Sequence, residues 1–194
     1  MGGMSDSVSR FPVTELEDLP DDLRARVGAI AEKSGFTPNI FRALGHRPAE
    51  LRAFLDYHDA LMERPAGLTK AERELVVVAT SGANHCTYCV VAHGAILRIR
   101  AKDPELSDRV ATNPWQVELD ERGRAIVDLA LALSQDSALF GEGDLTMARE
   151  AGLTEDEIWD VGAITALFAM SNRLAHLTDL RPNPEFYLMG RQKR

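Results

Sequence analysis

Residues 67–93 decide the fold of this chain, and they read GLTKAERELVVVATSGANHCTYCVVAH. Near their start, Thr69 and Glu72 form a capping box, in which a hydroxyl and a carboxylate each satisfy a free backbone N–H at a helix start. The pattern that follows predicts a helix over residues 70–81, a break containing glycine, and a second helix over residues 86–100. This stretch is therefore typical of two helices joined by a short connection.

One part of this stretch also fits a different structure. The run LVVV at residues 75–78 could be a buried strand that leads into a C-x-x-C helix, as in thioredoxin-like proteins. The helix is favoured because a capping box and a charged first turn precede the run. Few other segments have the alternating pattern that would complete a sheet.

Helical periodicity extends over the rest of the chain. Apolar residues recur every three or four positions, and glycine or proline stands at the segment ends. The segments with this pattern are residues 21–34, a short turn or helix from Pro38, a longer helix from Pro48 to about Pro65, and residues 120–133. The sequence therefore predicts an all-α fold.

A short sequence recurs in the second half of the chain. GLTKAE at residues 67–72 reappears 85 positions later as GLTEDE at residues 152–157, again as a capping box before an apolar helix. At this offset Ser171 takes the place of Cys86, so the second copy would share the helical frame without the thiols. Structural duplication and chance recurrence both stay open, because the match is short.

Length and charge limit the possible classes of protein. The chain has 194 residues, which suffices for one domain over residues 1–194, and residues 1–10 are expected to be disordered. With 30 acidic against 22 basic residues and no basic cluster, binding to nucleic acid or to an anionic membrane is not expected. No apolar run approaches the ~20 residues that span a bilayer, and no leader is recognisable. A cytoplasmic protein is expected.

Both cysteines of the chain lie in the fold-deciding stretch, as Cys86 and Cys89. In a reducing compartment such a pair rests as thiols, so a disulfide between them would be transient and functional. The free amides and the dipole at a helix start can lower a thiol pKa from ~8.5 towards ~3.5 to 7.5. The two thiols are chemically unequal, and the sequence leaves open which is the more acidic.

His93 follows Cys89 by four positions, so it lies one helical turn further along the same face. An imidazole there can accept a thiol proton, but it usually needs a third group to orient it. Glu74 is the leading candidate because the helical hairpin would return its carboxylate towards the cysteines. Its nearest rivals are Glu72 and Glu63.

Three other readings of these residues are weaker. Cys86, Cys89, His93 and His85 could together bind zinc, but they fall within nine residues, whereas structural zinc usually joins separate segments. No metal is therefore expected. A covalent c-type haem would need histidine at the position of Val90. Outside the motif, packing roles are expected for His58, His176, Trp115 and Trp159.

The assembled pattern, E-x11-C-x2-C-x3-H from Glu74 to His93, resembles the AhpD-like alkylhydroperoxidases of the carboxymuconolactone decarboxylase superfamily. The likeness is densest over residues 48–100, the expected redox-active core. Leu68-Thr69 before Glu72-Arg73-Glu74, and Asn84-x-Cys86-x-Tyr88-Cys89, resemble the branch called peroxidase-related enzymes.

The resemblance implies an all-α homo-oligomer, often a trimer or hexamer. It also implies that Cys89 is the peroxidatic thiol, that Cys86 is the resolving thiol, and that Glu74 with His93 removes the proton from Cys89. In the family's namesake a histidine precedes the second cysteine, whereas this chain has Tyr88. The decarboxylase branch lacks the cysteine pair, so decarboxylation is not expected.

On this resemblance, Cys89 is oxidised by a hydroperoxide to a sulfenic acid, which condenses with Cys86 to a disulfide. The chain has no flavin or nicotinamide fingerprint, so no cofactor is expected and electrons would come from a separate dithiol partner, such as a lipoyl- or thioredoxin-type donor. Two alternatives stay open. One is a general dithiol-disulfide oxidoreductase, and the other is a non-catalytic, redox-sensing helical oligomer.

Overall fold

The computed structural model describes residues 7–191, and within this range it contains helices and no strand. The predicted all-α fold is confirmed, and the strand alternative for residues 75–78 is wrong because a helix covers them. The helices are η1 (Leu16–Asp18), α1 (Asp21–Ser34), α2 (Asn39–Leu44), α3 (Pro48–Met62), α4 (Lys70–Ala83), α5 (Thr87–Ala101), α6 (Leu106–Thr112), η2 (Pro114–Gln116), α7 (Glu121–Gln135), α8 (Glu142–Glu150), α9 (Glu155–Thr178) and α10 (Pro184–Leu188).

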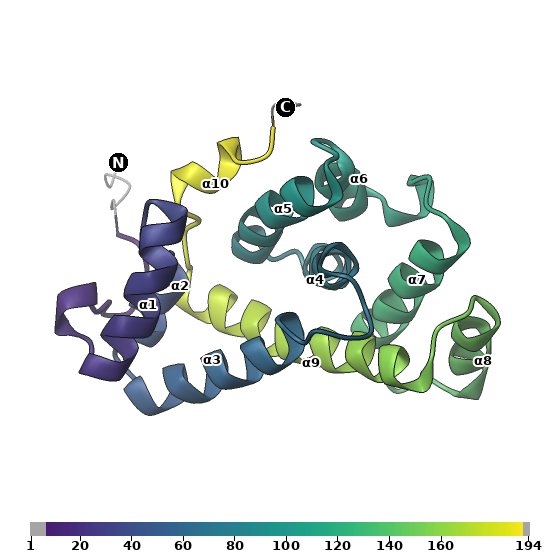
Figure 1. Ribbon diagram of the computed structural model, residues 1–194, viewed down its shortest axis with the longest axis horizontal. Coiled ribbons are helices and arrows are strands. Elements are labelled where there is room, and N and C mark those ends of the chain that lie inside the picture. Colours follow the sequence, from purple (N-terminus) through teal and green to yellow (C-terminus); the bar gives the residue numbers. More distant parts are fainter. Residues whose placement is uncertain (1–6, 192–194) are drawn as a thin grey trace.

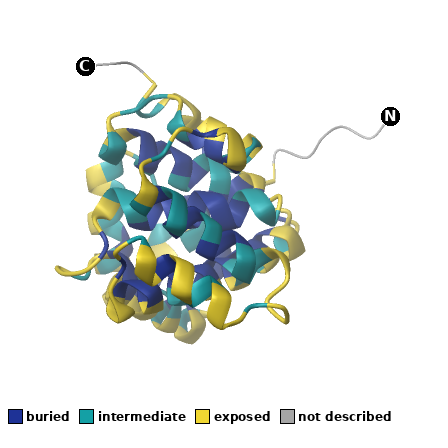
Figure 2. Cartoon of the chain, turned by 90° about the vertical axis from the view of Figure 1, so that its right-hand side faces the viewer, coloured by how far each residue is buried: buried dark blue, intermediate teal, exposed yellow. Residues whose placement is uncertain are grey.

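Helix α4 lies at the centre of the molecule, where it contacts α5, α6, α7 and α9 (Figure 1). Its valines Val76, Val77 and Val78 are all 0% exposed, so they pack on every side of the helix. The position of α4 among these helices explains its run of valines, because a helix that is apolar on every face must be buried. Figure 2 shows the same organisation from the side, with buried residues enclosed by exposed ones.

The described N-terminal residues are ordered, contrary to the expectation for residues 1–10. Arg10 N–H donates to the carbonyl of Thr178 at 2.8 Å, and the hydroxyl of Ser9 donates to the same oxygen at 3.1 Å. Arg181 N–H donates to the carbonyl of Val8 at 3.1 Å. These bonds fix the segment against the end of α9. The rest of the expectation, residues 1–6, lies outside the described residues.

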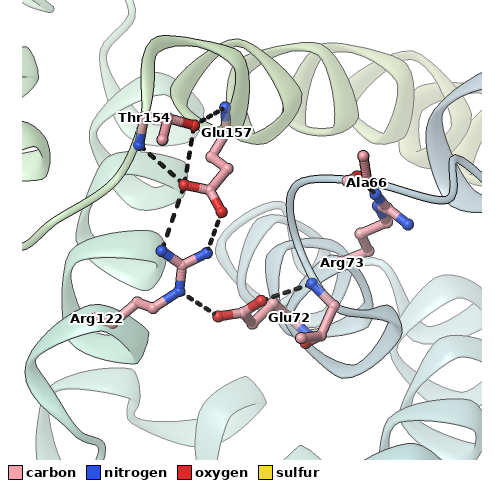
Figure 3. Close-up of polar contacts among 7 residues, drawn as sticks. Ala66, Glu72, Arg73, Arg122, Thr154 and Glu157 are labelled. Carbon is pink, nitrogen blue, oxygen red and sulfur yellow. Dashed lines mark hydrogen bonds and ion pairs between the residues drawn. The ribbon is translucent and has the colours of Figure 1, made fainter.

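Both predicted capping boxes are present, Thr69 with Glu72 at the start of α4 and Thr154 with Glu157 at the start of α9. Arg122 of α7 lies between them (Figure 3). Its Nε donates to Glu72 Oε1 at 2.7 Å, and its Nη2 donates to Glu157 Oε1 at 2.6 Å. One guanidinium therefore holds two helix starts together.

The 85-residue offset relates further features of the structure. Gly67 and Gly152, one residue before each Leu-Thr pair, have φ of +78° and +86°, which suits glycine. Thr80 and Thr165, also related by this offset, approach each other with their hydroxyl oxygens 3.4 Å apart. These likenesses support a duplication of the helical unit, which stays a prediction.

Both tryptophans were expected to be packing residues, but both are largely exposed. Trp115 is 64% exposed and Trp159 is 74% exposed. At the start of α9, Ile158 and Asp160 are buried instead, so Trp159 between them points outwards. At η2, it is Pro114 that is buried. The sequence indicated the helix, but Trp159 lies on its exposed face.

Arg122→Met is expected to lower the free energy of unfolding by ~1.5–3 kcal/mol near neutral pH, because it removes charge-assisted hydrogen bonds to two carboxylates. The hydrogen bond from Arg122 lowers the pKa of Glu157 from 4.5 to about 2. A carboxyl whose pKa is lowered in the folded state stabilises the fold above its unfolded pKa and loses that contribution as the pH falls. The difference between variant and wild type, measured by urea unfolding, should shrink as the pH falls from about 4.5 towards about 2.

The control for this experiment is Arg173→Met. Arg173 is exposed on α9, and its Nη1 donates to the carbonyl of Ala169 rather than to a carboxylate. Its loss should leave the unfolding free energy nearly unchanged at every pH. A stability difference for Arg122→Met that stays constant over the acid range would contradict the role given to Glu157.

Candidate active site

The cysteine pair stands where α4 and α5 meet. Cys86 is the N-cap residue of α5, and its N–H donates to the carbonyl of Ser81 at 2.9 Å, which ties the start of α5 to α4. His85 turns the chain with a φ of +54°, and its side chain is exposed. The predicted helical hairpin is therefore present, with α5 beginning one residue later than expected.

Both thiols are free and deeply buried. Cys86 and Cys89 are each 1% exposed, and they belong to a cluster with small apolar residues of α5, including Ala92 and Ala95. Their side chains form a hydrogen bond with each other. The arrangement allows the two sulfurs to exchange a proton without solvent.

The mutual hydrogen bond makes the two thiols unequal. It lowers the pKa of Cys86 to about 6, with further contributions from the N–H of Cys89 and the charge of His176. The same bond, together with burial, raises the pKa of Cys89 well above its ordinary value. At neutral pH the pair therefore holds one proton, with the negative charge on Cys86 and the proton on Cys89.

His93 and Glu74 form a buried pair beside the thiols. His93 Nδ1 lies 2.8 Å from Glu74 Oε2, where it donates to the carboxylate. Glu74 is 2% exposed, and the side chain of His93 is 16% exposed. Arg100 Nη1 lies 3.9 Å from the other Glu74 oxygen and opposes its negative charge. Phe168 packs edge-on against the His93 ring at 4.6 Å between centroids.

The two expected rivals of Glu74 have other partners. Glu72 completes the capping box of α4 and pairs with Arg122. Glu63 pairs with Lys70 at 2.6 Å. Glu74 is the carboxylate that the hairpin brings to His93.

The hydrogen bonds of the site connect His93 to Glu74 rather than to a thiol. Among the hydrogen bonds of residues 7–191, His93 pairs with Glu74, whereas Cys89 pairs with Cys86 and with Ser171 at 3.8 Å. The spacing of four residues places Cys89 and His93 on one face of α5, but the bond to Glu74 sets the direction of the imidazole. The Nε2 atom of His93 stays free to accept a proton.

Tyr88 serves as an anchor. Its phenol oxygen accepts a hydrogen bond from the N–H of Ile40 at 3.0 Å, which joins α5 to α2. Burial raises its pKa, so the phenol stays protonated at neutral pH. It therefore has no acid-base role like that of a histidine at the same position.

Sequence reasoning gave His58 a packing role and did not place it at this site. His58 comes from α3, and its ring lies 6.4 Å from that of His93, between centroids. Both rings contact Phe168. Burial lowers the pKa of His58, so it is neutral at neutral pH. The apolar pattern of α3 did not indicate that His58 lies near His93.

A polar cluster on α9 was also missed. Ser171 and Asn172 are 3% and 0% exposed. Ser171 contacts Cys89, and Asn172 lowers the pKa of both thiols. Asn172 bonds to Ser81 and Asn84, which come from α4 and from its end. A signal was available, since two polar residues interrupt an apolar helix at this point, and Ser171 is the residue that the repeat aligns with Cys86.

Zinc is the alternative interpretation of Cys86, Cys89, His93 and His85. Within the described part of the chain, no group of three or more His, Cys, Asp or Glu side chains is arranged to hold a metal ion. His85 points to solvent, away from the buried cysteines. Among residues 7–191, the helices also lack the combination of length and apolar character that a membrane crossing needs.

Comparisons with known proteins agree with this description. The carboxymuconolactone decarboxylase family matches residues 48–111. A crystal structure from Ralstonia eutropha, described as an alkylhydroperoxidase AhpD core and peroxidase-related protein, is 52% identical, covers 98% of this chain and 100% of its own, and has a TM-score of 0.95. The chain therefore belongs to the carboxymuconolactone decarboxylase family, in its AhpD-like part.

Two further structures extend the comparison. A peroxidase-related protein from a Silicibacter species is 32% identical, with 98% of this chain and 100% of the other covered and a TM-score of 0.91. The debrominase Bmp8 is 17% identical, with 97% and 98% covered and a TM-score of 0.78, so it shares the fold. A comparison with curated proteins finds no match.

Proposed function

We propose that this protein is a thiol-dependent peroxidase that reduces hydroperoxides through Cys86 and Cys89. The observation that carries the proposal is a buried pair of free, mutually hydrogen-bonded thiols beside the His93–Glu74 pair. A dithiol of this kind can supply two electrons, and the imidazole can move a proton. The peroxidase-related relatives support the same function.

In the proposed reaction, the Cys89 thiolate attacks the terminal oxygen of a hydroperoxide. The O–O bond breaks, the alkoxide takes a proton and leaves as an alcohol, and Cys89 becomes a sulfenic acid. The Cys86 thiolate then attacks the Cys89 sulfur. Hydroxide leaves and is protonated to water as the disulfide forms. A separate dithiol donor returns two electrons and two protons through a mixed disulfide.

The different pKa values suit these two roles. Cys86 is held as the thiolate, so the resolving thiol is ready to attack the sulfenic acid. Cys89 keeps its proton and therefore needs a base before it can react. We assign that base to His93, with Glu74 stabilising the imidazolium through the Nδ1 hydrogen bond.

We also propose that the chain works as a homo-oligomer, as a trimer or hexamer. Large apolar side chains on the surface support an assembly, because exposed apolar surface marks contact sites. The most exposed of them are Leu139, Leu188, Trp159, Met147 and Trp115. Light scattering after gel filtration would measure the number of copies.

The pH profile of the peroxide reaction should show the ionised pair. The rate is expected to rise with pH as Cys89 loses its proton, and His93 as the base should place that rise at lower pH than the raised pKa of Cys89 alone would require. His93→Ala should shift the profile to higher pH, since Cys89 then loses its proton to solvent. His85→Ala, at an exposed histidine, is the matched control. Superimposable profiles for His93→Ala and the wild type would remove His93 as the base.

Stopped-flow oxidation of the reduced protein separates the proposed function from its nearest alternative. Organic hydroperoxides should consume both thiols rapidly and yield one alcohol for each disulfide. A general dithiol-disulfide oxidoreductase would instead react faster with small disulfides and form no sulfenic acid. Slow oxidation by every hydroperoxide, beside fast oxidation by disulfides, would favour that alternative.

A further inference from the structure

The polar cluster on α9 has no part in the reaction steps described above, although it touches the reacting sulfurs. Ser171 Oγ lies 3.8 Å from Cys89 Sγ. Next to it, Asn172 is 0% exposed and its side chain bonds to Ser81, whose carbonyl accepts from the N–H of Cys86 at 2.9 Å. Its side chain also lowers the pKa of both thiols. Burying an amide costs free energy unless its polar atoms are satisfied. The orientation of this amide therefore decides what it does to the thiols.

Two neighbours fix the direction of the Asn172 amide. Asn84 Nδ2 donates to Asn172 Oδ1 at 3.0 Å, and Asn172 Nδ2 donates to Ser81 Oγ at 3.0 Å. An amide nitrogen carries two hydrogens, so one N–H is left after the bond to Ser81. With the amide oxygen turned towards Asn84, this N–H is the donor that the amide can offer to the sulfurs. Asn172 is thus held as a donor.

We propose that Asn172 is a catalytic residue, whose amide N–H donates to the thiolate of the Cys86–Cys89 pair and keeps the buried pair ionised. This inference rests on the peroxidase function proposed above. A neutral donor bonds more strongly to a thiolate than to a thiol, so it favours the charged form. The donor therefore opposes the effect of burial, which disfavours the charged thiolate. Ser171 adds a hydroxyl group 3.8 Å from Cys89 Sγ.

Other titratable groups also face the pair, and the test must separate them from Asn172. His176 of α9 acts on Cys86 through its charge, and its Nε2 lies 3.0 Å from the Asn84 carbonyl. Tyr88 on α5 is kept neutral because burial raises its pKa. His93, with Glu74, lies one turn further along α5. A variant at Asn172 changes none of these groups.

The experiment measures the thiolate absorbance of the reduced, full-length protein as a function of pH. Asn172→Ala is expected to raise the apparent pKa of the pair by about one to two units, the effect of a hydrogen bond to a charged group. Asn84→Ala should raise it less, because it frees the amide to rotate. Thr165→Val is the matched control. Thr165 is equally buried on α9, but it bonds to Thr80.

Peroxide kinetics give a second readout that a purely structural role would not produce. The rate of Asn172→Ala should fall about two- to tenfold near neutral pH and recover as the pH rises through the shifted pKa. Titration curves of Asn172→Ala and Asn84→Ala that overlay the wild type would overturn the proposal. An equal shift in Thr165→Val would overturn it too.

The two proposals can fail separately. The titration uses no peroxide, so a raised pKa in Asn172→Ala supports the donor role even if the wild type consumes no hydroperoxide. That result would reject the peroxidase function alone. Should Asn172→Ala not fold, as judged by circular dichroism, Asn84→Ala still decides the matter, because Asn84 lies at the partly exposed end of α4.

Discussion

Cys89→Ser is expected to abolish peroxide consumption, whereas Cys86→Ser should allow one oxidation and leave a stable sulfenic acid on Cys89. The reason is the division of roles between the thiols. Without Cys89 no nucleophile lies next to Ser171 to meet the peroxide, and without Cys86 no thiolate is present to resolve the sulfenic acid. Trapping with a sulfenic-acid reagent and mass spectrometry of the modified peptide measures both results.

The same experiment can reverse the assignment. The pKa of Cys86 is the lower of the two, so Cys86 is the thiol that could react in place of Cys89. A trapped sulfenic acid on Cys86 in the Cys89→Ser variant, with none on Cys89 in Cys86→Ser, would exchange the two roles. Both variants replace sulfur by oxygen in a side chain of nearly the same size, so the fold should be kept.

Glu74→Gln is expected to slow the peroxide reaction by ~10²- to 10⁴-fold, as for the loss of a positioned acid-base group. Glutamine can still accept the hydrogen bond from His93 Nδ1, so the geometry of the pair should persist. What is lost is the negative charge that stabilises the imidazolium when His93 takes the thiol proton. The rate constant of thiol oxidation, measured by stopped flow, gives the effect.

Glu72→Gln is the matched control on the same helix. Glu72 caps α4 and pairs with Arg122, away from the thiols, so its variant should lose ~0.5–2 kcal/mol of stability with little change in the reaction. Thermal unfolding measures that loss. An active Glu74→Gln protein beside a stable but inactive Glu72→Gln protein would show that the other glutamate serves the site.

The parts of the fold that the sequence predicts are those with local causes. The capping boxes at Thr69 and Thr154 define the starts of α4 and α9 because their hydrogen bonds join residues three positions apart. The exposure of Trp159 and the order of residues 7–10 depend on distant segments. The hydrogen bond from Arg10 to Thr178 joins residues far apart in the chain, so no local pattern contains it.

The residues of the candidate site also fall into a locally determined group and a group placed by distant packing. Glu74 and His93 could be paired from the sequence because one tight hairpin joins their helices. His58 and Asn172 could not, since they come from α3 and α9, whose places around the hairpin are set by packing. The free direction of His93 Nε2 also depends on a side-chain rotamer, which helical spacing leaves undetermined.

The most direct test of the account is a single-turnover experiment on the reduced wild-type protein. One equivalent of an organic hydroperoxide is added without any electron donor, and the alcohol, the free thiols and the intact mass are measured together. The account predicts one alcohol for each chain, loss of both thiols, and a Cys86–Cys89 disulfide that a dithiol reduces. Unchanged thiols with unconsumed peroxide would contradict it.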